Sequence, residues 1–180
     1  MAIVALGAAL AANAGAATNQ VDRLLAPPSA CPASTRTDTP DAVQMRAMAC
    51  LVEQVRVRAG LPSLRISTVL DRAADLKIDA DVRCEQFSHT PCGLAFLTVF
   101  SRVGYTGGVS SVVVGENLAW SQAPAASPRD VMDMWLHSPE HRRNLLSSQW
   151  RDFGLGVRAG FDFLGVHGVT LWANEFGARG

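Results

Sequence analysis

Residues 135–146 read Trp-Leu-His-Ser-Pro-Glu-His-Arg-Arg-Asn-Leu-Leu, and the rest of the chain is best understood from this stretch. Ser138 followed by Pro139 predicts a helix start, because a serine oxygen can accept a free backbone N–H and proline fits the first helical position. On that helix His141 shares a face with Leu145, four residues on. Leu145 is expected in the core. His141 should therefore lie along the rim of the core, as a metal ligand, a general base or a hydrogen-bonded core histidine.

Three further motifs accompany this stretch in a fixed order. They are Phe-Ser-His at 87–89, Gly-Glu-Asn-Leu-Ala at 115–119 and Gly-Leu-Gly-Val at 154–157. Together the four motifs resemble the bacterial branch of the superfamily of cysteine-rich secretory proteins, antigen 5 and pathogenesis-related class 1 proteins, over about Met45 to Gly177. The resemblance implies an α–β–α sandwich and a central cleft that can hold a divalent cation.

Length and composition are those of one globular domain. The chain has 180 residues, of which 48% are apolar, and this is enough to bury a core. Sixteen basic and sixteen acidic residues cancel, and no basic run occurs. The balance argues against a nucleic-acid partner, which would select a basic face.

The beginning of the chain predicts export. Residues 1–17 are uncharged, apolar and small, as in a secretory signal peptide. A transmembrane anchor is the alternative, since a bilayer is spanned by roughly 17–25 residues. We favour cleavage, which leaves no membrane span and places the protein outside the cell or in the cell envelope. Residues 18–40 are rich in Pro, Ser, Thr and Ala and predict a tethered tail, and residues 41–180 then form the domain.

Hydrophobic periodicity predicts several helices and a few strands. Helices are expected to start after Thr39, at Thr68, at Gly93, after Ser127 and after Ser138. Strands are expected over 110–114, 153–159 and 169–176, the last two joined as a hairpin by the loop 160–168. Helices flanking a small, mainly antiparallel sheet give an α+β fold, a three-layer α–β–α sandwich. The family resemblance implies the same fold.

The four cysteines, an even number, suit disulfides in an oxidising compartment. Cys84 and Cys92 bracket His89 and are expected to close a local loop, which leaves Cys31 to pair with Cys50. In the first predicted helix Cys50 lies opposite the apolar face, where it can tie down an overlying tail. A zinc cluster is the rival interpretation, but the chain has no Cys-x-x-Cys pair.

The candidate site combines His89, Glu116 and His141, from a loop, the end of a strand and a helix start. Two imidazoles and one carboxylate suit a zinc-like site with an open fourth position, and the resemblance implies that they line the cleft. The family's second glutamate is replaced here by Ser138, so modest cation affinity is expected. Glu116 can instead be structural, because a buried carboxylate beside Asn117 can accept backbone N–H bonds and pin the strand to a helix.

Three polar neighbours are interpreted as ordinary surface residues. Glu140 stands in the first turn of its helix, where a carboxylate favourably meets the helix dipole. His137 and His167 belong to no motif and are expected to be loop or surface histidines.

Three classes of function fit these residues. We favour a secreted binding module for a small-molecule, lipid or cell-envelope ligand, since the resemblance implies sterol or lipid binding and an envelope role. A hydrolase is the alternative, because Ser88 and Ser138 neighbour motif histidines and Glu116 could orient an imidazole. Against catalysis, the chain has no Gly-x-Ser-x-Gly and no His-Glu-x-x-His motif. The third class is a structural envelope protein in which the motifs serve the fold.

Overall fold

The computed structural model describes residues 20–180, so the expected signal segment 1–17 lies outside the described part. Short 3-10 turns are η1 (Pro28–Ala30) and η2 (Pro91–Gly93). The helices are α2 (Asp41–Arg58), α3 (Thr68–Cys84), α4 (Thr98–Arg102), α5 (Pro128–His137) and α6 (Pro139–Leu145). The strands are β1 (Arg65–Ile66), β2 (Val112–Gln122), β3 (Asp152–Phe163) and β4 (Val166–Arg179). Among the helices formed by residues 20–180, none is both long and apolar enough to cross a membrane.

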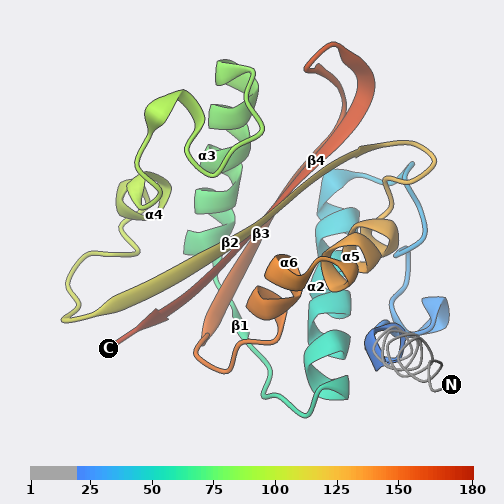
Figure 1. The fold of residues 1–180 in the computed structure, drawn as a ribbon, viewed down its shortest axis with the longest axis horizontal. Coiled ribbons are helices and arrows are strands. Elements are labelled where there is room, and N and C mark those ends of the chain that lie inside the picture. The colour runs from blue at the N-terminus through green and yellow to red at the C-terminus, as the bar shows by residue number, and fades with distance from the viewer. Residues whose placement is uncertain (1–19) are drawn as a thin grey trace, which may run out of the picture.

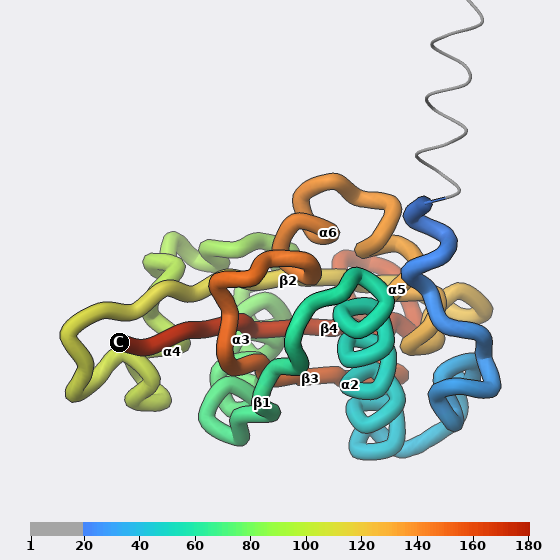
Figure 2. The backbone as a smooth tube through the Cα atoms, turned by 90° about the horizontal axis from the view of Figure 1, so that it is seen from below, coloured from blue at the N-terminus to red at the C-terminus, as the bar shows by residue number. Residues whose placement is uncertain are grey.

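The sheet lies between two layers of helices (Figure 1). Its strand order is β1-β3-β4-β2, with β2 at one edge. The pairs β2–β4 and β3–β4 are antiparallel, and the short β1 runs parallel to β3. Helices α3 and α4 cover one face, and α2, α5 and α6 cover the other. Figure 2 shows α6 beside the β2 edge, whereas α2 packs toward β3. The structure thus confirms the predicted α–β–α sandwich.

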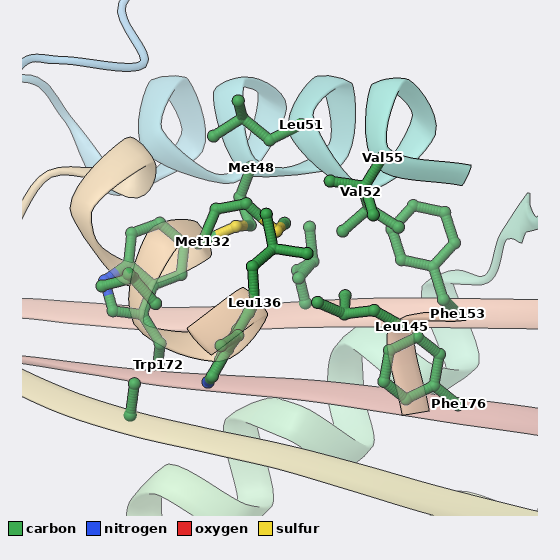
Figure 3. Packing of buried hydrophobic residues seen from close by; sticks show 14 of the residues in the cluster. Met48, Leu51, Val52, Val55, Met132, Leu136, Leu145, Phe153, Trp172 and Phe176 are labelled. Carbon is green, nitrogen blue, oxygen red and sulfur yellow. The ribbon is translucent and has the colours of Figure 1, made fainter. Parts of the chain in front are cut away.

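The larger core fills the space between the sheet and helices α2, α5 and α6 (Figure 3). Met48 from α2, Leu145 from α6 and Trp172 of β4 all belong to this core, and all three side chains are fully buried. Trp135 of α5 is also buried, and its indole N–H donates to the Leu118 carbonyl of β2 at 3.0 Å. The expected burial of Trp135 and Leu145 is confirmed, and the two residues fix α5 and α6 against the sheet.

Helix α3 approaches the other face of the sheet unusually closely. Its contact face is built from small residues, including Ala73 and Ala74, which are fully buried. A Cβ atom at Gly154 of β3 would lie 2.2 Å from the carbonyl carbon of Leu70 and 2.3 Å from the backbone nitrogen of Asp71. Only glycine fits at this point, which explains the first glycine of the Gly-Leu-Gly-Val motif in physical terms.

The structure shows how the starts of α3 and α6 are capped. Helix α3 does begin at Thr68, but Ser67 is the cap, since its Oγ accepts a backbone N–H of the first turn at 3.3 Å. Helix α6 begins after Ser138 as predicted, yet the Ser138 side chain makes no capping hydrogen bond. Its Oγ instead lies 2.8 Å from Nδ1 of His141. The expected serine cap was therefore wrong, because the hydroxyl has a competing partner three residues on.

Three element boundaries also differ from the prediction. Strand β2 continues to Gln122, so Glu116 lies in mid-strand and not at a strand end. Pairing in the last hairpin extends to Phe163 opposite Val166, which shortens the expected loop 160–168. The helix expected from Gly93 is reduced to α4, because Gly93 has a positive φ of 71° and Leu94 is extended, so a regular helix cannot start at Gly93.

The segment between residue 20 and α2 packs onto the larger core. Cys31 is fully buried and joined to Cys50 of α2, with a Cα–Cα distance of 5.7 Å. Ala26 is also fully buried, and the side chain of Arg129 on α5 donates to its carbonyl. The second disulfide joins Cys84 to Cys92. Both predicted pairings are confirmed, and the first one ties the segment to the sandwich.

Candidate functional site

The candidate residues gather at the edge strand β2. Successive side chains of a strand point to opposite faces, so neighbouring residues of the Gly-Glu-Asn motif serve different layers. Glu116 contacts His89, from the loop that follows α3. Asn117 points the other way and donates to the backbone carbonyl of His141 on α6, at 3.0 Å. The two motif histidines therefore approach the same strand edge from its two sides.

On the α3 side, His89 is bound through its ring to Glu116. Nδ1 of His89 and Oε1 of Glu116 form a hydrogen bond, and the Glu116 side chain is only 1% exposed whereas that of His89 is 56% exposed. An ionised carboxylate can only accept, so Nδ1 carries the proton of this bond. In the neutral ring Nε2 then keeps a free lone pair. Glu116 is thus the residue that orients His89.

The loop that carries His89 is itself held by a buried ion pair. Lys77 and Asp81 of α3 are both buried, with Nζ and Oδ1 3.1 Å apart. Lys77 also donates to the Ser88 carbonyl, next to His89. Burial raises the pKa of Asp81 to about 6, against the opposing effect of Lys77. Together with the Cys84–Cys92 disulfide, these contacts fix the position of the His89 ring.

On the α6 side, His141 is bound to Ser138 and to the sheet. Its Nδ1 lies 2.8 Å from Oγ of Ser138. Asn144 of α6 donates from Nδ2 to the carbonyl of Glu116 at 3.0 Å and to Oδ1 of Asn117 at 2.9 Å. With the bond from Asn117 to the His141 carbonyl, these contacts fasten α6 to the middle of β2.

The two histidines have opposite pKa perturbations. The hydrogen bond to Glu116 is the main cause that raises the pKa of His89. Burial lowers the pKa of His141. The positive charge of His89 lowers it further, so the two imidazoles interact electrostatically. At neutral pH His141 is therefore a neutral imidazole, and His89 holds a proton more strongly than a free histidine does.

The expected three-ligand set is not assembled as a metal centre. Within the part of the chain that the structure describes, no group of three or more His, Cys, Asp or Glu side chains is arranged to hold a metal ion. Glu116 is engaged with His89, and the donors left for a cation are Nε2 of His89 and Nε2 of His141. A ring bound through one nitrogen to an oxygen partner is the usual arrangement of metal-binding histidines. The two imidazoles fit such a role, with Glu116 and Ser138 behind them.

The serine, histidine and glutamate of the hydrolase hypothesis do not form one group, because they lie on opposite sides of β2. Ser138 lies beside His141, whereas Glu116 orients His89. The Ser88 hydroxyl accepts the backbone N–H of Thr90 at 3.1 Å. This arrangement separates the carboxylate from the serine–histidine pair.

The remaining polar neighbours lie on the surface. Glu140 is exposed in the first turn of α6, where the helix dipole favours a carboxylate. His137 lies between Asp22 and Asp133, 3.2 Å and 3.4 Å away, and His167 lies 2.9 Å from Asp162. Both histidines are exposed, whereas His141 is partly buried, and their ring partners among residues 20–180 are aspartates outside the motifs.

Sequence reasoning missed Glu175, which lies directly opposite Glu116 on β4. The Glu175 side chain is fully buried, and within residues 20–180 neither carboxylate oxygen receives a hydrogen bond from an N–H or O–H donor. A signal was present, because Glu175 is a single acid in the otherwise uncharged strand segment 169–176. Lys77 was also missed, and its signal was a charged residue on the same face of α3 as the buried Ala73 and Ala74.

Comparisons with known proteins concern the family and the fold of this chain. The sequence model of the cysteine-rich secretory protein family (CAP) matches residues 51–164. The chain is 27% identical over 165 residues to "Uncharacterized protein YkwD" of Bacillus subtilis, covering 89% of this chain and 58% of that protein. This chain therefore spans less than two thirds of the length of that relative.

Solved structures share the fold at low sequence identity. An extracellular protein containing an SCP domain from Bacillus anthracis has a TM-score of 0.61 at 24% identity, covering 76% of this chain and 40% of that one. An outer surface protein from Borrelia burgdorferi has a TM-score of 0.64 at 19% identity, covering 76% and 93%. A cysteine-rich secretory protein from Staphylococcus aureus has a TM-score of 0.56 at 16% identity, covering 77% and 39%. At these identities the likeness shows the fold alone.

Proposed function

This chain belongs to the cysteine-rich secretory protein family, and we propose that it is a binding module of the cell exterior or envelope. Its ligand site is the β2 edge between His89 and His141, and a divalent cation such as zinc is the ligand that these two rings suit. Two disulfides support export, because such bonds persist in oxidising compartments. The descriptions of the solved relatives as extracellular or outer surface proteins support the same location.

One observation carries the proposal. Each motif histidine is bound through Nδ1 to an oxygen from its own side of the sheet, Glu116 for His89 and Ser138 for His141. These bonds orient both rings and leave both Nε2 atoms as donors. A zinc ion bound there would supply a Lewis acid with open positions for a further ligand. With two protein donors in place of the usual three or four, its affinity should be modest.

Calorimetry with zinc tests the proposal. We expect measurable binding to the wild-type protein and its loss in the double variant His89→Ala, His141→Ala. The matched control is His137→Ala, His167→Ala, which removes two surface histidines and should leave the affinity unchanged. Equal binding by the wild type and the first double variant would contradict the proposed site, as would equal loss in both double variants.

The variant Ser138→Glu refines the same test. A carboxylate at this position adds the second acid of the family's pattern, so zinc affinity should rise. A lower affinity would show that the Ser138 hydroxyl, through its bond to His141, contributes more to zinc binding than an added carboxylate does.

A hydrolase using the same site is the second candidate, and the 2.8 Å contact between Ser138 Oγ and His141 Nδ1 favours it. A serine within hydrogen-bond reach of a neutral imidazole has a base for its proton. The pKa of His141 is lowered by burial, so the ring is neutral at pH 7 as a general base must be.

A serine-reactive fluorophosphonate probe separates the two candidates. The hydrolase requires labelling of the wild type that is lost in Ser138→Ala and kept in Ser88→Ala. The binding module requires no labelling at Ser138. Because Glu116 orients the other histidine, we expect the second outcome.

A further inference from the structure

Glu116 and Glu175 form a buried pair of acids across two strands. They stand directly opposite each other in the antiparallel register of β2 and β4, so their side chains emerge on the same face of the sheet. Glu116 is 5% exposed as a residue and Glu175 is fully buried. Two ionised carboxylates in contact repel each other, and in a buried position water cannot screen that repulsion.

The surroundings of Glu175 supply no donor for an ionised carboxylate. Both of its oxygens lack an N–H or O–H partner among residues 20–180. The charged groups facing it are Glu116 on β2 and Lys77 and Asp81 on α3. Lys77 is the single cation of this set, and its ammonium is engaged with Asp81 and with the Ser88 carbonyl. A protonated carboxyl, by contrast, carries its own donor.

We propose that Glu175 is a positioning residue, which as a neutral carboxylic acid donates a hydrogen bond to Glu116 and thereby holds that carboxylate against His89. The resulting chain runs from Glu175 on β4 through Glu116 on β2 to the His89 ring in the disulfide-closed loop. Burial, followed by the charge of Glu116, raises the pKa of Glu175 well above its ordinary range, in agreement with this state. The inference deepens the proposed ligand site, because His89 is one of its two donors.

The protonation state is tested on the protein without any metal. In protein labelled with ¹³C at the glutamate carboxyl, one side-chain carboxyl should remain protonated at pH 7. The signal should be absent from Glu175→Gln. A wild-type spectrum in which every glutamate is ionised at pH 7 would overturn the proposal by itself, whatever the variants do.

The positioning role is tested by the Nδ1 proton of His89. This proton should be visible by NMR in the wild type, since its bond to Glu116 slows exchange with water. Glu175→Gln keeps a donor, its side-chain amide, and should retain the signal. Glu175→Met fills a similar space without a donor and should lose it. Retention in both folded variants would show that Glu175 acts only by filling space. Loss in both would show that an amide donor at this position does not hold Glu116 against His89, and either result would overturn the positioning role.

The two proposals fail in different ways. Absence of zinc binding by the wild type would count against the ligand site and would leave both NMR results to be decided independently. If Glu175→Met does not fold, the carboxyl spectra of the wild type and Glu175→Gln still decide the protonation state, and loss of the His89 signal in Glu175→Gln would still overturn the donor role.

Discussion

Replacing Asn144 by alanine should lower the free energy of unfolding by about 2–4 kcal/mol, because its amide is what fastens α6 to β2. The Asn144 Nδ2 donates to two acceptors, the Glu116 carbonyl at 3.0 Å and Oδ1 of Asn117 at 2.9 Å. Each acceptor left unsatisfied in a buried place costs about 1–3 kcal/mol. The two acceptors together give about 2–6 kcal/mol. The better helix propensity of alanine returns roughly 0.5 kcal/mol, and water can partly reach the half-buried side, so we expect the lower part of this range, about 2–4 kcal/mol.

Urea denaturation at pH 7, followed by circular dichroism and tryptophan fluorescence, measures this loss. The control is Arg143→Ala, which changes the adjacent exposed residue of the same helix and should stay within about 0.5 kcal/mol of the wild type. If the two variants unfold at the same urea concentration, the Asn144 amide does not hold α6 on the sheet. The positions of Ser138 and His141 would then need another explanation.

Three further predictions concern packing and pH. Trp135→Ala should cost about 3–5 kcal/mol, as for a large aromatic removed from a core, and a melting temperature within a degree or two of wild type would contradict its burial. Gly154→Ala should cost about 1–3 kcal/mol or prevent folding, because the new Cβ would overlap the backbone of α3 at Leu70; unchanged stability in the same urea assay would refute the close approach. Zinc affinity should fall as the pH is lowered, starting above the ordinary histidine value of about 6.5 because the folded pKa of His89 is raised, and calorimetry across pH 6–8 that shows constant affinity would contradict this.

The layers of the fold could be predicted because local patterns determine them. Periodic apolar residues locate α2 and α3, and Ser-Pro pairs locate the starts of α5 and α6. The cysteines left few pairings, and both predicted disulfides are present. Burial of Trp135 and Leu145 follows from the same helix faces. All of these inferences use neighbours within a few turns of chain.

The details of the site depend on long-range register, which local patterns do not contain. Glu116 faces Glu175 because β2 and β4 pair in one register out of several, and a shift by one residue would place it on the other face. The same register aims Glu116 at His89 and Asn117 at α6. A sequence pattern therefore identifies the site residues without showing which of them orient others and which remain free to bind.

Ser138 shows a second feature that local sequence patterns do not determine, namely the partner chosen by a side-chain hydroxyl. Its hydroxyl had two plausible partners, a free backbone N–H at the start of α6 and the ring of His141 three residues on. Both lie within reach of the same rotatable group, and the differences between such hydrogen bonds are only about 1 kcal/mol. The structure has the histidine as the partner, and this choice converts an expected cap into part of the site.

The central claim is that the Nε2 atoms of His89 and His141 are the donors of the ligand site. The most direct measurement is a zinc titration of protein labelled with ¹⁵N in its histidine rings, followed by NMR at pH 7.5. We predict that the Nε2 signals of His89 and His141 shift together, and that those of His137 and His167 stay in place. Shifts confined to His137 and His167, or no shift of any ring at millimolar zinc, would contradict the claim.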